Sequence, residues 1–443
     1  MFTTENPDQK NKKNQEDPIN RYWVVERVIL KTPNEDLNID LTNSFLRIEI
    51  NSGISSAFTQ GSIIFEEFSD LQTLMGLSGN EVLEINIKSI EGKEYSKRFK
   101  VLQIIPPLKS PATTQKIITI KFASFVYYNN MLKSFSKAFN RKKATECVKQ
   151  IYRDYMDDET TPLIIPQETD STISITIPYR KPKEAIDIIT KYSSFDGLYD
   201  YVFYEDIEKC VYVPLSVLKE KEKSLEFVSV RDNENRDTED GSRDVDFYRK
   251  KIISYSIDGD MYNIPKNINS GNYAATNINL NMTLKEVTNR IFIYENYFAE
   301  SENNIESSPI IPKSKNEEIA VANTSKITVT YEPTLTSDGQ ILSQNILDSF
   351  YKRKSVNNIF KQILSIKTHS RCDLLPGEII GTSIIGNKSL QTTDNTDKYV
   401  SGNYMVLSCI HIFEKTKSES TFILGRDSIP QNIPSEIEVS EEG

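Results

Sequence analysis

The chain offers few side chains that could act as a nucleophile, a general base or a metal ligand. It contains two His in 443 residues, His369 and His411. Both lie in stretches where apolar and polar residues alternate, a pattern typical of β-strands. A His in a strand can be an acid–base group or a ligand, although a hydrogen-bonded structural role is the more common one. Two His also exclude a His-rich metal centre.

The four cysteines, Cys147, Cys210, Cys372 and Cys409, lie far apart and form no Cys-x-x-Cys pair. This spacing favours reduced thiols over a disulfide framework or a zinc site. Cys147 and Cys409 fall on apolar stripes and are expected to be small core residues. Cys372 follows Arg371, whose charge could lower the pKa of the thiol. No His or Asn lies near it in sequence to complete a nucleophilic site.

Other candidate motifs are weak. Residues 381–389, GTSIIGNKS, resemble a phosphate-binding loop, but Asn387 stands where Lys is required and no helix is predicted after it. Glu66, Glu67 and the acidic stretch 231–246 could hold glycosidase carboxylates or Ca²⁺, yet paired carboxylates are common and the chain has a single Trp for stacking on sugars. We therefore predict no catalytic, cofactor-binding or metal-binding residue, no cofactor, and no enzymatic activity.

The composition narrows the class of protein. Lys and Arg number 53 against 63 Asp and Glu, a net charge of −10, so a reader of DNA or RNA is not expected unless one face is locally basic. No apolar run approaches the ~18 residues of a membrane span. The 22 Tyr and 20 Phe argue against wholesale disorder. The polar N-terminus lacks the apolar segment of a secretory signal.

The first half of the chain predicts a β domain followed by an α+β domain. From 21 to 124, six short runs of β-branched and aromatic residues alternate with Gly, Pro, Asn or Ser, which predicts six strands. So many strands are expected to close into a small barrel or sandwich, because open edges aggregate. Apolar residues recur at helical spacing over 143–156, and Pro182 opens a second helix over 182–195. A strand hairpin follows.

The last part of the chain returns to strands after a predicted helix at 341–353, and it echoes the first part. Gly79 and Glu81 open one strand, Gly377 and Glu378 open another, and the next strands read KRFKVLQI and NYMVLSCI. A repeat would mean two related barrels in one chain. The alternative is that any antiparallel meander shows turns followed by β-branched runs.

The predicted fold class is β-rich α+β. The predicted division is a flexible N-terminal arm at 1–20, a first barrel at 21–126, an α+β domain at 127–220, a second barrel formed by 221–260 with 341–429, an inserted irregular α+β region at 261–340, and a loose C-terminal tail at 430–443. The acidic stretch 231–246 is predicted to be a loop.

Three pairs of segments occur in an order that carries a family resemblance. The first pair is RYWVVERVILKTP and SGISSAFTQGSIIFEEFSDLQTLMGLSGNEVLEINIKS; the second is SFSKAFNRKKATECVKQIYRDY and ITIPYRKPKEAIDIITKYSSFDGLYDYVFYED. The third is LLPGEIIGTSI and VSGNYMVLSCIHIFEKTKSESTFILGRDS. Together they resemble the baseplate hub proteins of contractile-tailed bacteriophages, a family related to the hub part of type VI secretion spike proteins. Residues 260–340 match least.

The resemblance implies two tube-like β-barrels per subunit and a homotrimer that forms a pseudo-hexameric ring. Such a hub adapts the six-fold tail tube to the three-fold central spike and gives a channel for DNA, which touches it only in transit. The implied partners are the spike protein, the tail tube protein, the tape-measure protein and the baseplate wedge proteins, without membrane insertion. The implied location is the virion tail baseplate, after synthesis in the host cytoplasm.

Two other interpretations remain open at this point. The chain could be a different β-rich tail or secretion-spike assembly protein. Less in keeping with the residues, it could be a tail-associated cell-wall hydrolase. An acidic composition suits a channel that must release DNA, although acidic residues on an outer surface that only keep the protein in solution fit equally well.

Overall fold

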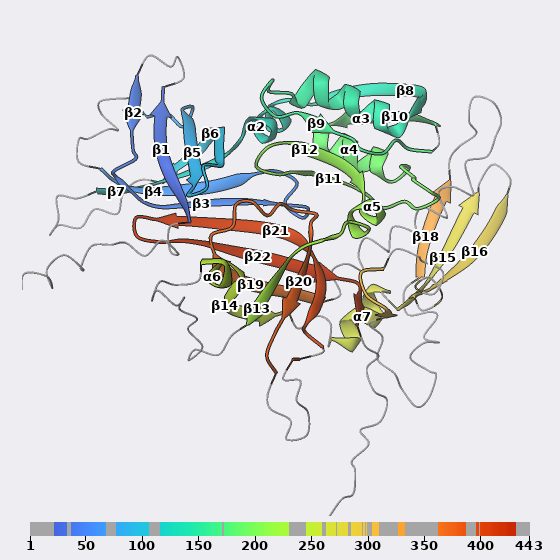
Figure 1. Ribbon diagram of the computed structural model, residues 1–443. Helices are drawn as coiled ribbons and strands as arrows, with labels where there is room; N and C mark the ends of the chain where they lie inside the picture. Colours follow the sequence, from blue (N-terminus) through green and yellow to red (C-terminus); the bar gives the residue numbers. More distant parts are fainter. Residues whose placement is uncertain are drawn as a thin grey trace, which may run out of the picture.

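The computed structural model shows a seven-stranded sheet, a six-stranded sheet and an α+β domain that packs against both (Figure 1). The residues that it describes are 22–32, 37–67, 77–105, 116–170, 172–229, 245–258, 263–271, 273–281, 285–294, 296, 298, 304–309, 327–332, 362–386, 396–397 and 399–430. The arm at 1–20, the helix predicted at 341–353, most of the acidic stretch 231–246 and nearly all of the tail lie outside these residues.

The first sheet is antiparallel and has the strand order β2-β1-β5-β6-β7-β4-β3. Its strands are β1 (Trp23–Lys31), β2 (Asn38–Asp40), β3 (Phe45–Gly53), β4 (Gln60–Glu67), β5 (Val82–Ser89), β6 (Glu94–Ile105) and β7 (Lys116–Ser124). Alternating apolar side chains point inward, and Phe65, Phe99 and Phe122 fill one continuous core. Within the described residues no ladder joins β1 to β3. A hydrogen bond from Leu41 N to Val28 O (2.8 Å) instead ties the turn between β2 and β3 to β1.

The second sheet is a closed barrel in which each strand pairs with two neighbours of the same ring. Its order is β13-β20-β21-β22-β19-β14, and β14 returns to β13. The strands are β13 (Lys223–Ser229), β14 (Lys251–Ile257), β19 (Gln362–His369), β20 (Ile379–Ser383), β21 (Gly402–Glu414) and β22 (Ser418–Arg426). Strand β13 runs parallel to both of its neighbours, and the other pairings are antiparallel. Phe227, Tyr404 and Phe422 lie in its core.

The two sheets repeat one strand order. Leaving aside the short edge strand β2, the strands A to F of the first sheet in chain order are β1, β3, β4, β5, β6 and β7, and those of the second are β13, β14, β19, β20, β21 and β22. Both sets have the order A-D-E-F-C-B. The echo in the sequence therefore corresponds to a repeat of strand order, whereas an unrelated meander would have no reason to share this permuted order.

The α+β domain lies between 125 and 219 and covers one side of both sheets (Figure 1). Its elements are α2 (Phe125–Leu132), β8 (Phe135–Lys143), α3 (Ala144–Ile151), the π-helix η2 (Tyr152–Met156), β9 (Leu163–Ile164), β10 (Thr172–Arg180), α4 (Pro182–Thr190), β11 (Tyr201–Glu205), β12 (Cys210–Pro214) and α5 (Leu215–Lys219). The predicted helices over 143–156 and 182–195 are confirmed, although α4 ends early at Thr190. The predicted hairpin is β11–β12.

The remaining elements are short and lie around the second barrel or to its right in Figure 1. They are α6 (Val245–Lys250), α7 (Ile264–Ser270), β15 (Ala274–Asn281), β16 (Glu286–Ile293), β17 (Ser308–Pro309), β18 (Ile327–Glu332) and β23 (Ser428–Ile429). Strands β16, β15 and β18 form a small separate sheet to the right in Figure 1. None of the helices in the described segments is long and apolar enough to cross a membrane.

Candidate functional site

Of the residues singled out in the sequence for chemistry, the structure brings His411 close to the Arg371–Cys372 stretch, because Ser420 Oγ contacts His411 and accepts from Arg371 N at 2.9 Å. His411 is buried in β21, where its Nδ1 lies 2.8 Å from Ser420 Oγ. Burial lowers the pKa of His411 to about 4, partly opposed by the charge of Asp373. His369 lies on β19 and faces Glu419 of β22. The structural interpretation of both His therefore fits their surroundings.

The prediction that Arg371 could lower the pKa of Cys372 is wrong. The Arg371 guanidinium instead makes two hydrogen bonds to the Asp373 carboxylate, from Nε at 2.9 Å and from Nη2 at 2.8 Å. Burial raises the pKa of the Cys372 thiol to about 12. Cys147 and Cys409 are buried core residues as predicted, and burial raises the pKa of each.

The other candidate motifs remain apart. Glu67 is buried while its neighbour Glu66 is half-buried, because successive residues of β4 point to opposite faces of the sheet. Residues 379–383 form β20 of the barrel, and the last positions of the phosphate-loop-like stretch, from 387, lie outside the described residues. Across the part of the chain that the structure describes, no three His, Cys, Asp or Glu side chains cluster as metal ligands would.

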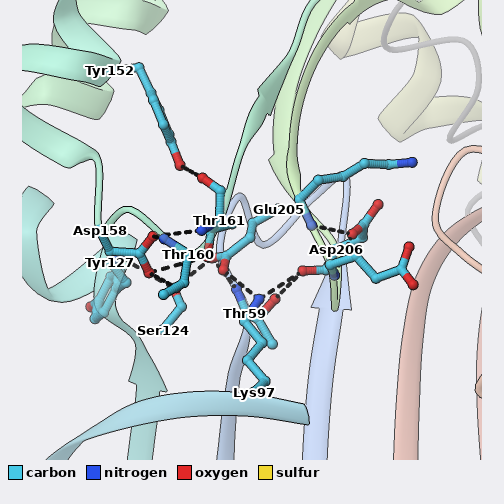
Figure 2. A network of polar contacts seen from close by, with 12 residues as sticks. Thr59, Lys97, Ser124, Tyr127, Tyr152, Asp158, Thr160, Thr161, Glu205 and Asp206 are labelled. Carbon is cyan, nitrogen blue, oxygen red and sulfur yellow. Dashed lines mark hydrogen bonds and ion pairs between the residues drawn. The ribbon is translucent and has the colours of Figure 1, made fainter. Parts of the chain in front are cut away.

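A buried ion pair joins the first sheet to the α+β domain (Figure 2). Lys97 of β6 places its Nζ 2.8 Å from Oε1 of Glu205, at the end of β11, and also donates to the carbonyl of Asp206 at 3.0 Å. The second carboxylate oxygen of Glu205 accepts from Thr59 N (3.0 Å) and from Ser124 Oγ (2.6 Å). Both charges are shielded from water, and each is compensated by several partners, as a buried pair requires.

A second layer of hydrogen bonds surrounds this junction. Asp158 accepts from the backbone and hydroxyl groups of Thr160 and Thr161, and Tyr152 OH donates to the carbonyl of Thr161 at 2.6 Å (Figure 2). Asp206 accepts from two backbone N–H groups in the following turn, although burial raises the pKa of its carboxyl group overall. These hydrogen bonds fix the loop that contains Asp158 and the turn that follows strand β11.

The second barrel is tied to the α+β domain by an equivalent device. Lys219 at the end of α5 places its Nζ 2.6 Å from Oδ2 of Asp427, directly after β22, and both are buried. Burial alone would raise the pKa of Asp427, but the Lys219 charge and hydrogen bonds from Lys219, Ser428 and Ile305 lower it overall. Both sheets are therefore fixed to one domain by a buried Lys–carboxylate pair.

The two sheets are also joined directly, along a seam between β3 and β21. Residues 408–414 of β21 pair antiparallel with residues 47–53 of β3, so the thirteen strands form one continuous sheet. At one end Ile54 N donates to Leu407 O at 2.8 Å. A Cβ at Gly53 would lie 2.6 Å from Leu407 O, so the close approach of the two backbones requires a glycine there. Figure 1 shows the two strands side by side at the centre of the molecule.

Neither the seam nor the buried pairs could have been found from the sequence. Lys97 and Glu205 are 108 positions apart, and each reads as an ordinary polar position of a strand. The seam joins segments at opposite ends of the chain. The sequence echo between the two segments indicated that the two sheets are related. It gave no indication that they are in contact.

Comparisons with known proteins support the fold. No protein-family model matches the chain, and no curated protein matches it either. Among solved structures it is similar to a tail protein from Neisseria meningitidis MC58, with a TM-score of 0.55 at 10% identity over 91% of this chain and 97% of that one. It is also similar to the 43 kDa tail protein of prophage MuSo2 from Shewanella oneidensis, with a TM-score of 0.53 at 9% identity over 91% and 100% of the two chains.

These similarities extend over nearly the whole length of both relatives. They confirm, at the level of fold, the predicted resemblance to phage tail proteins. At such low identity the shared property is the arrangement of strands and helices. The chain thus shares the fold of these two tail proteins, built as two sheets of repeated strand order around an α+β domain.

Proposed function

We propose that this protein is a structural baseplate hub of a contractile phage tail. In this proposal three copies form a ring whose six sheets, two from each copy, face the six-fold tail tube on one side and the three-fold central spike on the other. DNA passes through the channel of the ring. The predicted domain division belongs to the same proposal, with one difference: of the two predicted barrels, the second closes through its ladders, whereas in the described part of the first no ladder joins β1 to β3.

The observation that carries this proposal is the repeated strand order of two sheets joined edge to edge. One chain with two equivalent sheets can occupy two positions of a six-fold arrangement, so three copies satisfy six positions. The seam between β3 and β21 gives the relation between neighbouring positions inside one chain. The fold shared with two tail proteins supports placing this geometry in a phage tail.

The proposed role is mechanical rather than enzymatic. His411, the buried thiols and the buried Lys–carboxylate pairs are accounted for by packing and hydrogen bonds within and between the domains. The proposed partners are the spike protein, the tail tube protein, the tape-measure protein and the wedge proteins. The proposed location is the virion tail, assembled in the host cytoplasm.

The oligomeric mass tests the proposal. Native mass spectrometry of the full chain, alone and mixed with the spike protein of the same phage, should reveal a species of three chains, near 152 kDa for a chain of 50.7 kDa. A chain that stays monomeric in both samples would contradict the proposal. Clearing of a cell-wall gel by the purified chain would instead support a hydrolase.

A further inference from the structure

The basic residues of the α+β domain are concentrated on one antiparallel pair of strands, β8 and β10. Residues 133–143 and 172–183, which comprise these two strands and the start of α4, contain eight Lys and Arg and no Asp or Glu. The whole chain, in contrast, has a net charge of −10. We call these two segments the cationic ribbon. Figure 1 shows it along the top of the α+β domain, away from the two large sheets. Such a local excess of one charge attracts anions.

The two faces of the cationic ribbon differ. On one face, side chains such as Phe139 and Ile177 are buried in the core of the α+β domain. The opposite face carries small exposed residues: Ala138 of β8 pairs with Thr176 of β10, and Ser174 lies two positions before Thr176. An extended chain can therefore lie beside this ribbon without displacing a large side chain.

Both long edges of the ribbon lack a strand partner in the part of the chain that the structure describes. Its sheet consists of β10 and β8 alone. Every second residue of an antiparallel strand points its N–H and C=O away from the partner strand, so each edge presents a row of backbone donors and acceptors. Edges of this kind bind extended segments of other polypeptides as an additional strand.

Neighbouring elements balance about half of the ribbon's charge. Four acids lie within ion-pair distance of its cations, in the pairs Lys137–Asp154, Lys143–Glu168, Lys183–Asp187 and Arg180–Glu184. Eight cations against these four acids leave an excess of four positive charges. Lys133, Lys142 and Lys181 are exposed cations outside these pairs.

The density of charge favours an acidic polypeptide over nucleic acid as the partner. A nine-residue strand such as β8 or β10 extends about 30 Å. An added strand of that length with an acid at every second position brings about four or five carboxylates, which matches the excess of four. A DNA duplex brings about 18 charges over the same length, and the four acids beside the ribbon would repel it.

We infer that the cationic ribbon binds an acidic, extended segment of a partner protein, which adds to one edge of the ribbon as a third strand. Backbone hydrogen bonds hold the segment in register, and the Lys and Arg side chains attract acids at alternate positions. This surface lies apart from the seam between β3 and β21. The inference therefore goes beyond the proposed ring and does not depend on it.

Fluorescence anisotropy of the full chain with a labelled peptide of about ten alternating Thr and Glu residues tests the inference. We expect saturable binding at about 150 mM salt, weakened by at least about tenfold in Lys142→Glu with Lys181→Glu. Both positions are exposed, so thermal unfolding should change little. The matched control is Lys191→Glu with Lys250→Glu, two exposed positions outside the ribbon with the same change of charge, which should bind like the wild type. Equal weakening in both double variants would overturn the inference.

A second peptide separates strand addition from attraction of charge alone. In it Pro replaces every Thr, which keeps all the acids but removes half of the backbone N–H groups. The affinity should fall by at least about tenfold, because an added strand depends on main-chain hydrogen bonds. Equal affinity of the two peptides would show that charge alone holds them, and would overturn the inference.

A DNA duplex of about 20 base pairs is the remaining probe. Binding of the duplex that is tighter than that of the peptide, and lost in Lys142→Glu with Lys181→Glu, would assign the ribbon to nucleic acid and overturn the inference. If neither probe binds more tightly to the wild type than to this variant, the inference fails as well. The Lys and Arg residues would then only keep other chains away from the ribbon's edges, as charged residues on edge strands commonly do.

Discussion

The two sheets share a strand order, β2 apart, but differ in the direction of one strand. Strand β1 runs antiparallel to β5, whereas its counterpart β13 runs parallel to β20 and β14. In the second sheet this strand pairs on both sides and closes the barrel. In the first sheet a cleft of about 380 Å³, lined by residues of β1 and by Phe45 and Phe413, lies beside the gap between β1 and β3.

The difference follows from the connections. Two parallel neighbours need a crossover of a dozen or more residues, and residues 230–250 connect β13 to β14. That crossover contains the acidic stretch 231–246. The first sheet needs no such crossover, because β2 turns back beside β1 and leads into β3. One repeated order can thus produce a closed barrel or an open sheet, depending on the direction of a single strand.

The largest effect that tests this comparison should come from Lys97→Ala. The open first sheet depends on its neighbours, and this variant leaves Glu205 charged, buried and without its cation. Breaking such a pair typically costs about 3–5 kcal/mol of unfolding free energy. Urea denaturation measures the loss, and hydrogen exchange should show it concentrated in the first sheet. Lys88→Ala on the neighbouring β5, an exposed ion pair, is the control, and equal losses would contradict the account.

The second-largest expected effect is a pH dependence of the unfolding free energy, which arises from His411 in the seam between β3 and β21. Burial places the pKa of His411 at about 4, below its ordinary value of 6.5. The unfolded chain therefore binds a proton at this residue first, and stability falls as the pH drops from about 6.5 to 4. The full loss from this residue is about 3 kcal/mol. His411→Gln should flatten this part of the pH profile.

The control for that prediction is the same substitution at His369, which is only half-buried on β19. Urea midpoints measured at several pH values between 4 and 7 provide the comparison. If His411→Gln and the wild type lose stability in parallel over this range, burial of His411 is not the source of the pH dependence.

A smaller effect is expected from Gly53→Ala. The added Cβ would meet Leu407 O at 2.6 Å and Ser408 Cα at 2.8 Å, so one strand of the seam must shift. Overpacking of this kind typically costs about 1–3 kcal/mol. Thermal unfolding measures it, with Ser256→Ala on the exposed β14 as the control. An unchanged melting temperature would show that the two strands are not held this closely.

Local structure was predictable from the sequence where the pattern was strong. Alternating residues gave the strands around Ile85 and Ile120, and Pro182 marked the start of α4. The Val-Leu stretches at 101 and 406 pointed to the repeat. These signals are local. The periodicity of apolar side chains predicts which face of a strand or helix is buried, but not which element packs against that face.

Long-range features were not predictable for physical reasons. The direction of β13 depends on the path of the connection between β13 and β14. The alternation of apolar and polar residues is the same in a parallel and in an antiparallel strand, so it does not predict this direction. The pKa of Cys372 was predicted with the wrong sign because the thiol is buried, and because Asp373, two positions from Arg371, takes the guanidinium. The Lys97–Glu205 pair depends on how two domains dock, which periodicity does not encode.

The central claim is that copies of this chain arrange their repeated sheets around one channel. A cryo-electron microscopy reconstruction of the full chain with its spike protein tests it most directly. The account predicts six sheets around the channel, two from each of three copies, with β3 and β21 paired within each copy. Isolated chains, or a ring without six sheets around its channel, would contradict it.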